Sequence, residues 1–334
     1  MLPYRLVDAL DLLRLNLLSP MVLAFVLGMV AVFVRSDLRL PEALYTSLSI
    51  YLLLSIGLKG GAELSETPFA TLVLPALATL VLGVTIPVVV YAVMRRVGRF
   101  GVADAAAVAA HYGSVSAVTF TAAITTMSAL DVRVEGFMPA LVALLEVPAI
   151  VVALSIARSR LEVSAPGAAS GRAEVWRELL TGRSLFVLLG GLVIGALGGK
   201  AGLAQVAPFF VDPFKGALVL FLLEMGMVAA GRIRDLKKVG PFVIGFGLLA
   251  PIVNGSVGVL LATLSGLSIG GSTILGVMAA SASYIAAPAA VRIALPQANP
   301  ALYLGASLGV TFPFNLSVGI PLMYALSRAL HGLM

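Results

Sequence analysis

Runs of about twenty apolar residues follow one another through almost the whole chain, and they limit the fold more than any other feature. A helix of that length crosses the hydrocarbon core of a bilayer. Hydrophobic residues make up 60% of the sequence and charged residues 11%, whereas soluble domains have about 45–50% and about 25%. The runs are too uniformly apolar for the alternating strands of a membrane barrel. The sequence therefore predicts an all-α integral membrane protein.

The breaks between the apolar runs predict about ten transmembrane helices. We expect spans at 20–34, 42–62, 69–94, 103–127, 136–157, 183–199, 210–231, 241–264, 269–295 and 300–328. The sixth of these is short. The preceding segment, 1–19, carries charges among its leucines and predicts a short helix lying at the membrane interface.

The chain divides into two similar halves. A polar linker at 158–182 separates a first group of five spans, 20–157, from a second group, 183–334. Four pairs of residues agree in order at separations of 165–169: Gly28 and Gly195, Gly57 and Gly226, Ser114 and Ser283, and Pro148 and Pro313. Because five is odd, the second copy enters the membrane from the opposite side. The sequence thus predicts two inverted five-helix repeats, which are typical of secondary transporters.

The basic residues are shared unequally between the two sides of the membrane. Most Arg and Lys fall in the loops after the first, third, fifth, seventh and ninth spans, and such loops are usually cytoplasmic. We therefore expect a multi-pass protein of the bacterial inner membrane with the linker in the cytoplasm and both termini periplasmic. These loops also account for the net charge of +6, so we expect the lipid bilayer and no nucleic acid as a partner.

Polar residues gather at corresponding places in spans 4 and 9, which we expect to be broken helices. Gly113 loosens the backbone of span 4 and Pro288 interrupts span 9. The exposed N-termini of two half-helices would attract an anion. The expected substrate site comprises Gly113, Ser114, Val115, Ser116, Ser281, Ala282 and Ser283. The alternative is that these hydroxyls bond to carbonyls one turn back and serve helix packing.

Ionisable and amide groups within spans are further candidates, because they are costly in hydrocarbon. Glu146 precedes Pro148 and would bind sodium, accept a proton or pair with a basic group. Asn254 is either a clasp between helices or a cation ligand. Lys59 and Glu224 occupy neighbouring positions of equivalent helices and are expected to form an ion pair.

Two other polar residues have alternative interpretations. We expect His111 to make a packing hydrogen bond rather than to carry protons. Arg292 either attracts the anion or is a solvated charge at the end of its span.

Several chemistries are excluded. The chain has no cysteine and only two histidines, so disulfides and multi-histidine metal sites are ruled out. It has no zinc-protease, nucleotide-binding or serine-hydrolase motif. We therefore expect neither an enzyme nor a cofactor other than a coupling ion.

The segments "GSVSAVTF", "IGLKGG" and "ALPQANPALYLGASLGVTFP" resemble the sodium-dependent bicarbonate transporter family first associated with cyanobacteria. The resemblance implies a mobile core domain, a gate or scaffold domain and a homotrimer; some members bind a PII-like cytoplasmic regulator. It places the bicarbonate and sodium sites at Ser114, Ser116, Thr119, Ser281 and Ser283. Cyanobacterial members have an aspartate where this chain has Tyr284, so we expect Glu146 to compensate for a missing sodium ligand. The linker is shorter than in some members.

These observations predict a secondary transporter that takes up bicarbonate with sodium by alternating access. The expected coupling-ion residues are Ser116, Thr119, Glu146, Asn254 and Tyr284. One alternative is a carrier of another small anion, coupled to protons through Glu146. Another is a channel or membrane sensor that binds its ligand without active transport.

Overall fold

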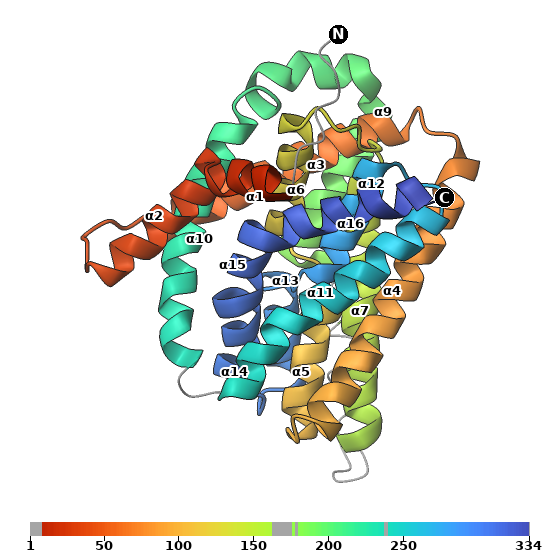
Figure 1. Ribbon diagram of the computed structural model, residues 1–334. Helices are drawn as coiled ribbons and strands as arrows, with labels where there is room; N and C mark the ends of the chain where they lie inside the picture. Colours follow the sequence, from red (N-terminus) through yellow and green to blue (C-terminus); the bar gives the residue numbers. More distant parts are fainter. Residues whose placement is uncertain (1–8, 162–175, 178–179, 237–239, 334) are drawn as a thin grey trace.

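The computed structural model describes residues 9–161, 176–177, 180–236 and 240–333. Within these ranges the chain is almost entirely helical and contains no strand (Figure 1). Most of the predicted linker, and residues 1–8 of the predicted interfacial segment, lie outside the described residues. Residues 9–17 of the interfacial segment form a helix.

The helices follow the apolar runs of the sequence. The first half contains α1 (Ala9–Leu17), α2 (Pro20–Phe33), α3 (Glu42–Leu64), α4 (Phe69–Arg96), α5 (Val102–Gly113), α6 (Ala117–Ala129) and α7 (Met138–Leu161). The second half contains α9 (Arg183–Phe210), α10 (Phe214–Leu236), α11 (Pro241–Leu264), α12 (Ile269–Ala280), α13 (Ala286–Ala294), α14 (Pro300–Leu304), α15 (Phe312–Phe314) and α16 (Ile320–Leu333). Two π-helical segments, η2 (Gly305–Thr311) and η3 (Asn315–Gly319), lie within the last expected span.

Eight helical segments of the described residues are long and apolar enough to cross a membrane. Two of them, 102–129 and 300–333, run through several of the elements named above. The remaining expected spans correspond to the shorter apolar helices α2 and α12. The chain is therefore a multi-pass, all-helical membrane protein.

Proline and glycine fix the starts of several helices. Pro20 occupies the first turn of α2, and the Ser19 hydroxyl accepts a hydrogen bond from the Val22 N–H at 3.3 Å. α11 begins with Pro241 after Gly240, whose φ of 82° favours glycine. Proline is suited to the first turn because the N–H it lacks has no partner there. These signals explain why sequence and structure agree closely at these boundaries.

Four helices form one packed group in which α3 lies against α9 and α2 against α10. Glycines allow these close approaches. A Cβ on Gly195 of α9 would lie 2.2 Å from the Leu58 carbonyl oxygen of α3, and one on Gly28 of α2 would lie 2.0 Å from the Leu223 carbonyl oxygen of α10. α4, α5, α6, α7, α11, α12, α13 and the last span make up the second group. The two groups meet through α3, α7, α9, α10 and η2.

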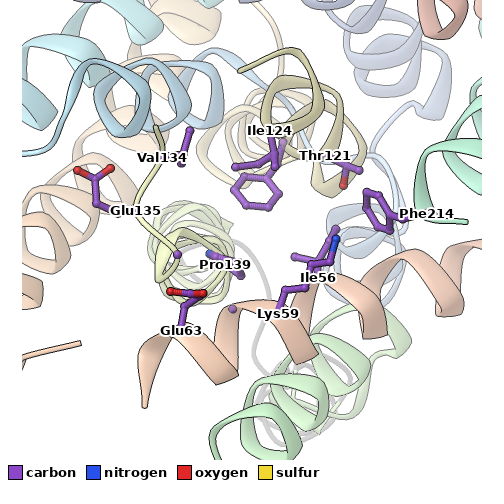
Figure 2. Close-up of a pocket in the computed structure, with 12 residues that line it drawn as sticks. Ile56, Lys59, Glu63, Thr121, Ile124, Val134, Glu135, Pro139 and Phe214 are labelled. Atoms are coloured by element: carbon purple, nitrogen blue, oxygen red, sulfur yellow. The ribbon is translucent and has the colours of Figure 1, made fainter. Parts of the chain in front are cut away.

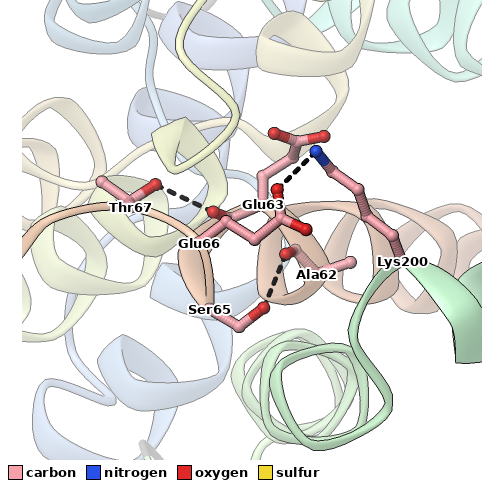
Figure 3. A network of polar contacts seen from close by, with 6 residues as sticks. All are labelled: Ala62, Glu63, Ser65, Glu66, Thr67 and Lys200. Atoms are coloured by element: carbon pink, nitrogen blue, oxygen red, sulfur yellow. Dashed lines mark hydrogen bonds and ion pairs between the residues drawn. The ribbon is translucent and has the colours of Figure 1, made fainter.

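α9 is longer than expected because it continues beyond a kink. Gly199 takes φ 58° and ψ −164°, and the helix resumes and runs to Phe210. Lys200, just after the kink, pairs with Glu66 beyond the end of α3 at 2.5 Å (Figure 3). Both side chains are more than half exposed, so this pair contributes little stability.

Candidate functional site

Two helix interruptions that begin with the same backbone geometry lie in the second group of helices. α5 ends at Gly113 and α6 begins at Ala117, while α12 ends at Ala280 and α13 begins at Ala286. The residues that follow α5 and α12 are both extended: Ser114 has φ −87° and ψ 171°, and Ser281 has φ −84° and ψ 168°. The chain thus leaves helical geometry in the same way at both places.

Hydrogen bonds join the two interruptions. The Ser116 N–H donates to the Ser281 hydroxyl at 2.9 Å, and the Ser283 N–H donates to the His111 carbonyl at 2.8 Å. The four serines of the two segments, Ser114, Ser116, Ser281 and Ser283, are at most 3% exposed. The structure therefore brings together the residues predicted from the two halves, and we call residues 114–116 and 281–285 the crossing.

Serine hydroxyls also cap the helices that leave the crossing. The Ser116 hydroxyl accepts from the Thr119 N–H at 3.1 Å, and the Ser283 hydroxyl accepts from the Ala287 N–H at 3.2 Å. Ser116 therefore corresponds to Ser283, and Ser114 to Ser281, in a register two residues from the sequence pairing of Ser114 with Ser283. α6 and α13 both begin here, and a helix N-terminus carries roughly half a positive charge.

Several buried polar atoms near the crossing have no hydrogen-bond partner among the described residues: Ser114 Oγ, Tyr284 Oη and His111 Nε2. The Tyr284 phenol lies close to the Ser116 side chain but makes no hydrogen bond with it. Burying such atoms without partners is costly. A polar ligand at the crossing would supply these atoms with hydrogen-bond partners.

The interruption after α5 comes directly after Gly113, whereas Pro288 lies beyond the interruption after α12. Pro288 lies in the first turn of α13, where a missing N–H costs little, and the interruption comes before it. Gly113 is the last residue of α5. A glycine is needed there for close packing, because a Cβ would lie 2.9 Å from Cδ of Pro87. Val115 and Ala282 lie within the crossing and are buried, as are its serines.

The other predicted coupling-ion residues are less directly connected to the crossing. The Thr119 hydroxyl donates to the Ser116 hydroxyl at 2.9 Å. Glu146 of α7 is 6% exposed and makes no hydrogen bond or ion pair with any described residue. Asn254 of α11 is buried, and its amide nitrogen has no partner in the described part of the chain. Within that part, no hydrogen bond links either residue to the crossing.

Asn315 was not singled out from the sequence, although it follows Pro313 in the last span. Its amide donates to the Ala280 carbonyl at the end of α12 at 2.9 Å. Asn315 therefore links the last span to the end of α12, beside the crossing. Its Oδ1 is a further buried oxygen without a hydrogen-bond partner among the described residues. An amide within an apolar span is the signal that identifies it.

The predicted ion pair between Lys59 and Glu224 is wrong. Lys59 Nζ instead lies 4.9 Å from the centre of the Phe214 ring at the start of α10. Glu224 is ten residues further along that helix, a rise of roughly 15 Å. Its Oε2 is buried without a partner in the described chain. Arg292 is exposed near the end of α13. The His111 Nδ1–H donates a hydrogen bond to the Ala107 carbonyl at 2.7 Å.

A cavity of about 170 Å³ lies beside α6 (Figure 2). α3 contributes Ile56, Lys59 and Glu63, and α6 contributes Thr121 and Ile124. The cavity therefore lies between the two helix groups, along α6, whose N-cap is Ser116.

Comparison with known proteins decides the family. The model of the Na+-dependent bicarbonate transporter superfamily matches residues 20–328, nearly the whole chain. The chain belongs to this superfamily. A search of curated proteins gave no match. The resemblance inferred from "GSVSAVTF" and the block at 294–313 is thus confirmed, and the helices and crossing described above are those of a Na+-dependent bicarbonate transporter superfamily member.

Proposed function

We propose that the protein takes up bicarbonate together with sodium by alternating access, with the crossing as its substrate site. The main observation is the crossing itself: two half-helices begin there, and several buried polar atoms lack partners among the described residues. Family membership supplies the substrate class. A small oxyanion can accept hydrogen bonds from hydroxyls such as that of Ser114 and is stabilised by the positive ends of α6 and α13.

Sodium needs oxygen ligands, and the same place provides them. α5 and α12 end where α6 and α13 begin, so carbonyl groups at these C-termini lie beside the anion site. The orphan oxygens of Tyr284 and Asn315 add to this set. We propose that sodium binds at these oxygens together with Thr119 and Ser116, so that each ion neutralises the charge of the other.

An inverted repeat is the proposed basis of this arrangement. Each glycine of the pairs Gly28 with Gly195 and Gly57 with Gly226 lies where a Cβ would come within 2.7 Å of a carbonyl oxygen on a partner helix. The contact of α2 with α10 corresponds in the repeat to that of α9 with α3. The equal backbone angles of Ser114 and Ser281 support the same relation.

The two helix groups fit a division into two domains. We propose that α2, α3, α9 and α10 form the gate or scaffold domain, and that the group containing the crossing moves against it as the core domain. From the family resemblance we also propose that the protein forms a trimer and binds a PII-like regulator. From the distribution of basic residues we propose that it lies in the inner membrane with both termini periplasmic.

Uptake into proteoliposomes tests the proposal. Labelled bicarbonate is supplied with an inward sodium gradient, with a proton gradient, or with neither. We expect saturable accumulation against the bicarbonate gradient only when sodium is present. Accumulation that follows the proton gradient would instead favour coupling through Glu146, which is buried without a partner among the described residues. Flux that only runs downhill would identify a channel.

A further inference from the structure

A second cavity, of about 340 Å³, lies where α9 begins. It is lined by Thr181, Gly182, Arg183, Ser184 and Leu185 on one side and by Ile285, Ala286 and Ala289 of the α13 region on the other. α9 belongs to the four-helix group and α13 to the group with the crossing. The cavity therefore lies between the two groups, next to the start of a half-helix.

This cavity and the one around Lys59 lie at opposite ends of the same helix pair. Gly57 and Gly61 of α3 pack against Leu188 and Leu192 of α9 respectively, so the two helices run in parallel. Arg183 Nη1 donates to Thr46 Oγ1 at 3.3 Å, near the start of both helices. Thr46 and Lys59 are thirteen residues apart on α3, a rise of roughly 20 Å. The crossing thus has one cavity along α6 and another along α13.

The second cavity is electropositive. Arg183 is the one charged residue among its described lining residues; its bond to Thr46 is to a neutral hydroxyl, and no carboxylate of the described residues forms an ion pair with it. The ion pair of Lys200 with Glu66 lies beyond the opposite end of α3. α9 begins after Gly182 without a side-chain cap, and α13 begins after Ile285 with only its Ala287 N–H bonded to a side chain, the Ser283 hydroxyl. Each helix start adds roughly half a positive charge to that of Arg183.

Tyr45 of α3 does not line the cavity but lies near both Arg183 and the crossing. The Tyr45 phenol of α3 lies within electrostatic range of Arg183 and of Glu224, and it is also in range of Tyr284 in the crossing. Its ring stacks on Phe221 at 5.2 Å, which fixes its direction. Glu224, the carboxylate within range of Tyr45, does not line the cavity.

We propose that this cavity is an anion vestibule in which Arg183 holds the transported anion between the crossing and the face where α9 begins. The inference rests on the proposed function for the identity of the anion. The electropositive character of the cavity does not depend on it. A guanidinium pairs well with a planar carboxylate-like oxyanion, because it offers two parallel N–H donors.

The absence of native cysteine allows a direct test. Ala289→Cys places one thiol in the vestibule, and its modification is followed with an anionic, sulfonate-bearing methanethiosulfonate reagent and with a cationic, trimethylammonium-bearing one. We expect the ratio of anionic to cationic rates to fall roughly tenfold when Arg183→Gln is added. Arg183→Lys should largely retain the ratio. Arg160→Gln, a change at an exposed arginine near the end of α7, should leave it unchanged.

Sodium bicarbonate is then added as a competitor. The proposal predicts that it slows modification of Ala289→Cys by the anionic reagent, and that Arg183→Gln abolishes the protection. A ratio that does not respond to Arg183→Gln would overturn the vestibule. If the ratio responds but bicarbonate neither protects nor is transported, the vestibule stands and the proposed substrate fails.

Discussion

The hydrogen bond that joins the two halves of the crossing gives the sharpest expectation. Ser281→Ala removes the hydroxyl that accepts from the Ser116 N–H at 2.9 Å and donates to the Met278 carbonyl at 2.8 Å. Ser116 is 3% exposed, so solvent cannot readily replace the lost acceptor. An unsatisfied buried N–H costs about 1–3 kcal/mol. That penalty destabilises the closed crossing, by which we mean the conformation with the hydrogen bond between Ser116 and Ser281.

The assay is bicarbonate uptake into proteoliposomes at saturating sodium. If the closed crossing is the binding-competent state, its lower population raises the apparent KM for bicarbonate by about 5- to 150-fold. Ser307→Ala is the matched control, because Ser307 is equally buried but its hydroxyl donates to the Tyr303 carbonyl one turn back. The control should stay within about twofold, since such back-bonds add little. Equal effects of the two substitutions would refute the reasoning.

Three further substitutions follow from the packing and the polar contacts. Gly195→Ala should lower the yield of monodisperse protein and its melting temperature, because the new Cβ would lie 2.2 Å from the Leu58 carbonyl oxygen, whereas Gly198→Ala, with no atom within 4 Å, should not. Lys200→Gln should change the melting temperature and uptake little, because its pair with Glu66 is exposed; a large loss would show a role beyond that pair. Tyr284→Phe should keep the fold, since it removes a buried hydroxyl that has no partner among the described residues, and should raise the sodium concentration for half-maximal uptake; an unchanged sodium dependence would exclude Tyr284 as a ligand.

Most helices could be placed from the sequence because their boundaries are set by local signals. Apolar runs bounded by Pro20, by Pro68 before α4 and by Gly240 with Pro241 leave little freedom at these ends. The extension of α9 was missed because Gly199 breaks the helix geometry without ending the helix. The π-helical turns around Pro313 were also missed. They depend on tertiary contacts such as the bond from Asn315 to Ala280.

The candidate site could be placed to within a few residues, because dense hydroxyls in both halves of an apolar chain are costly to bury unless they bind something polar. The register of the two halves was two residues off, since Ser114 and Ser281 are matched by backbone geometry and not by neighbouring sequence. The pairing of Lys59 with Glu224 failed for a different reason. Two residues at equivalent positions of two repeated helices need not lie at the same height in the packed structure, and Lys59 lies beside Phe214, ten residues before Glu224. Three-dimensional placement also revealed Arg183 beside α13, which lies more than one hundred residues away in the sequence.

The central claim is that the crossing binds the transported anion. The most direct measurement is equilibrium binding of labelled bicarbonate, with sodium present, to purified wild-type protein and to a Ser114→Ala, Ser283→Ala double variant. We predict saturable binding to the wild type and its loss in the variant, with the variant still monodisperse and helical. Binding that persists in the folded double variant would contradict the account.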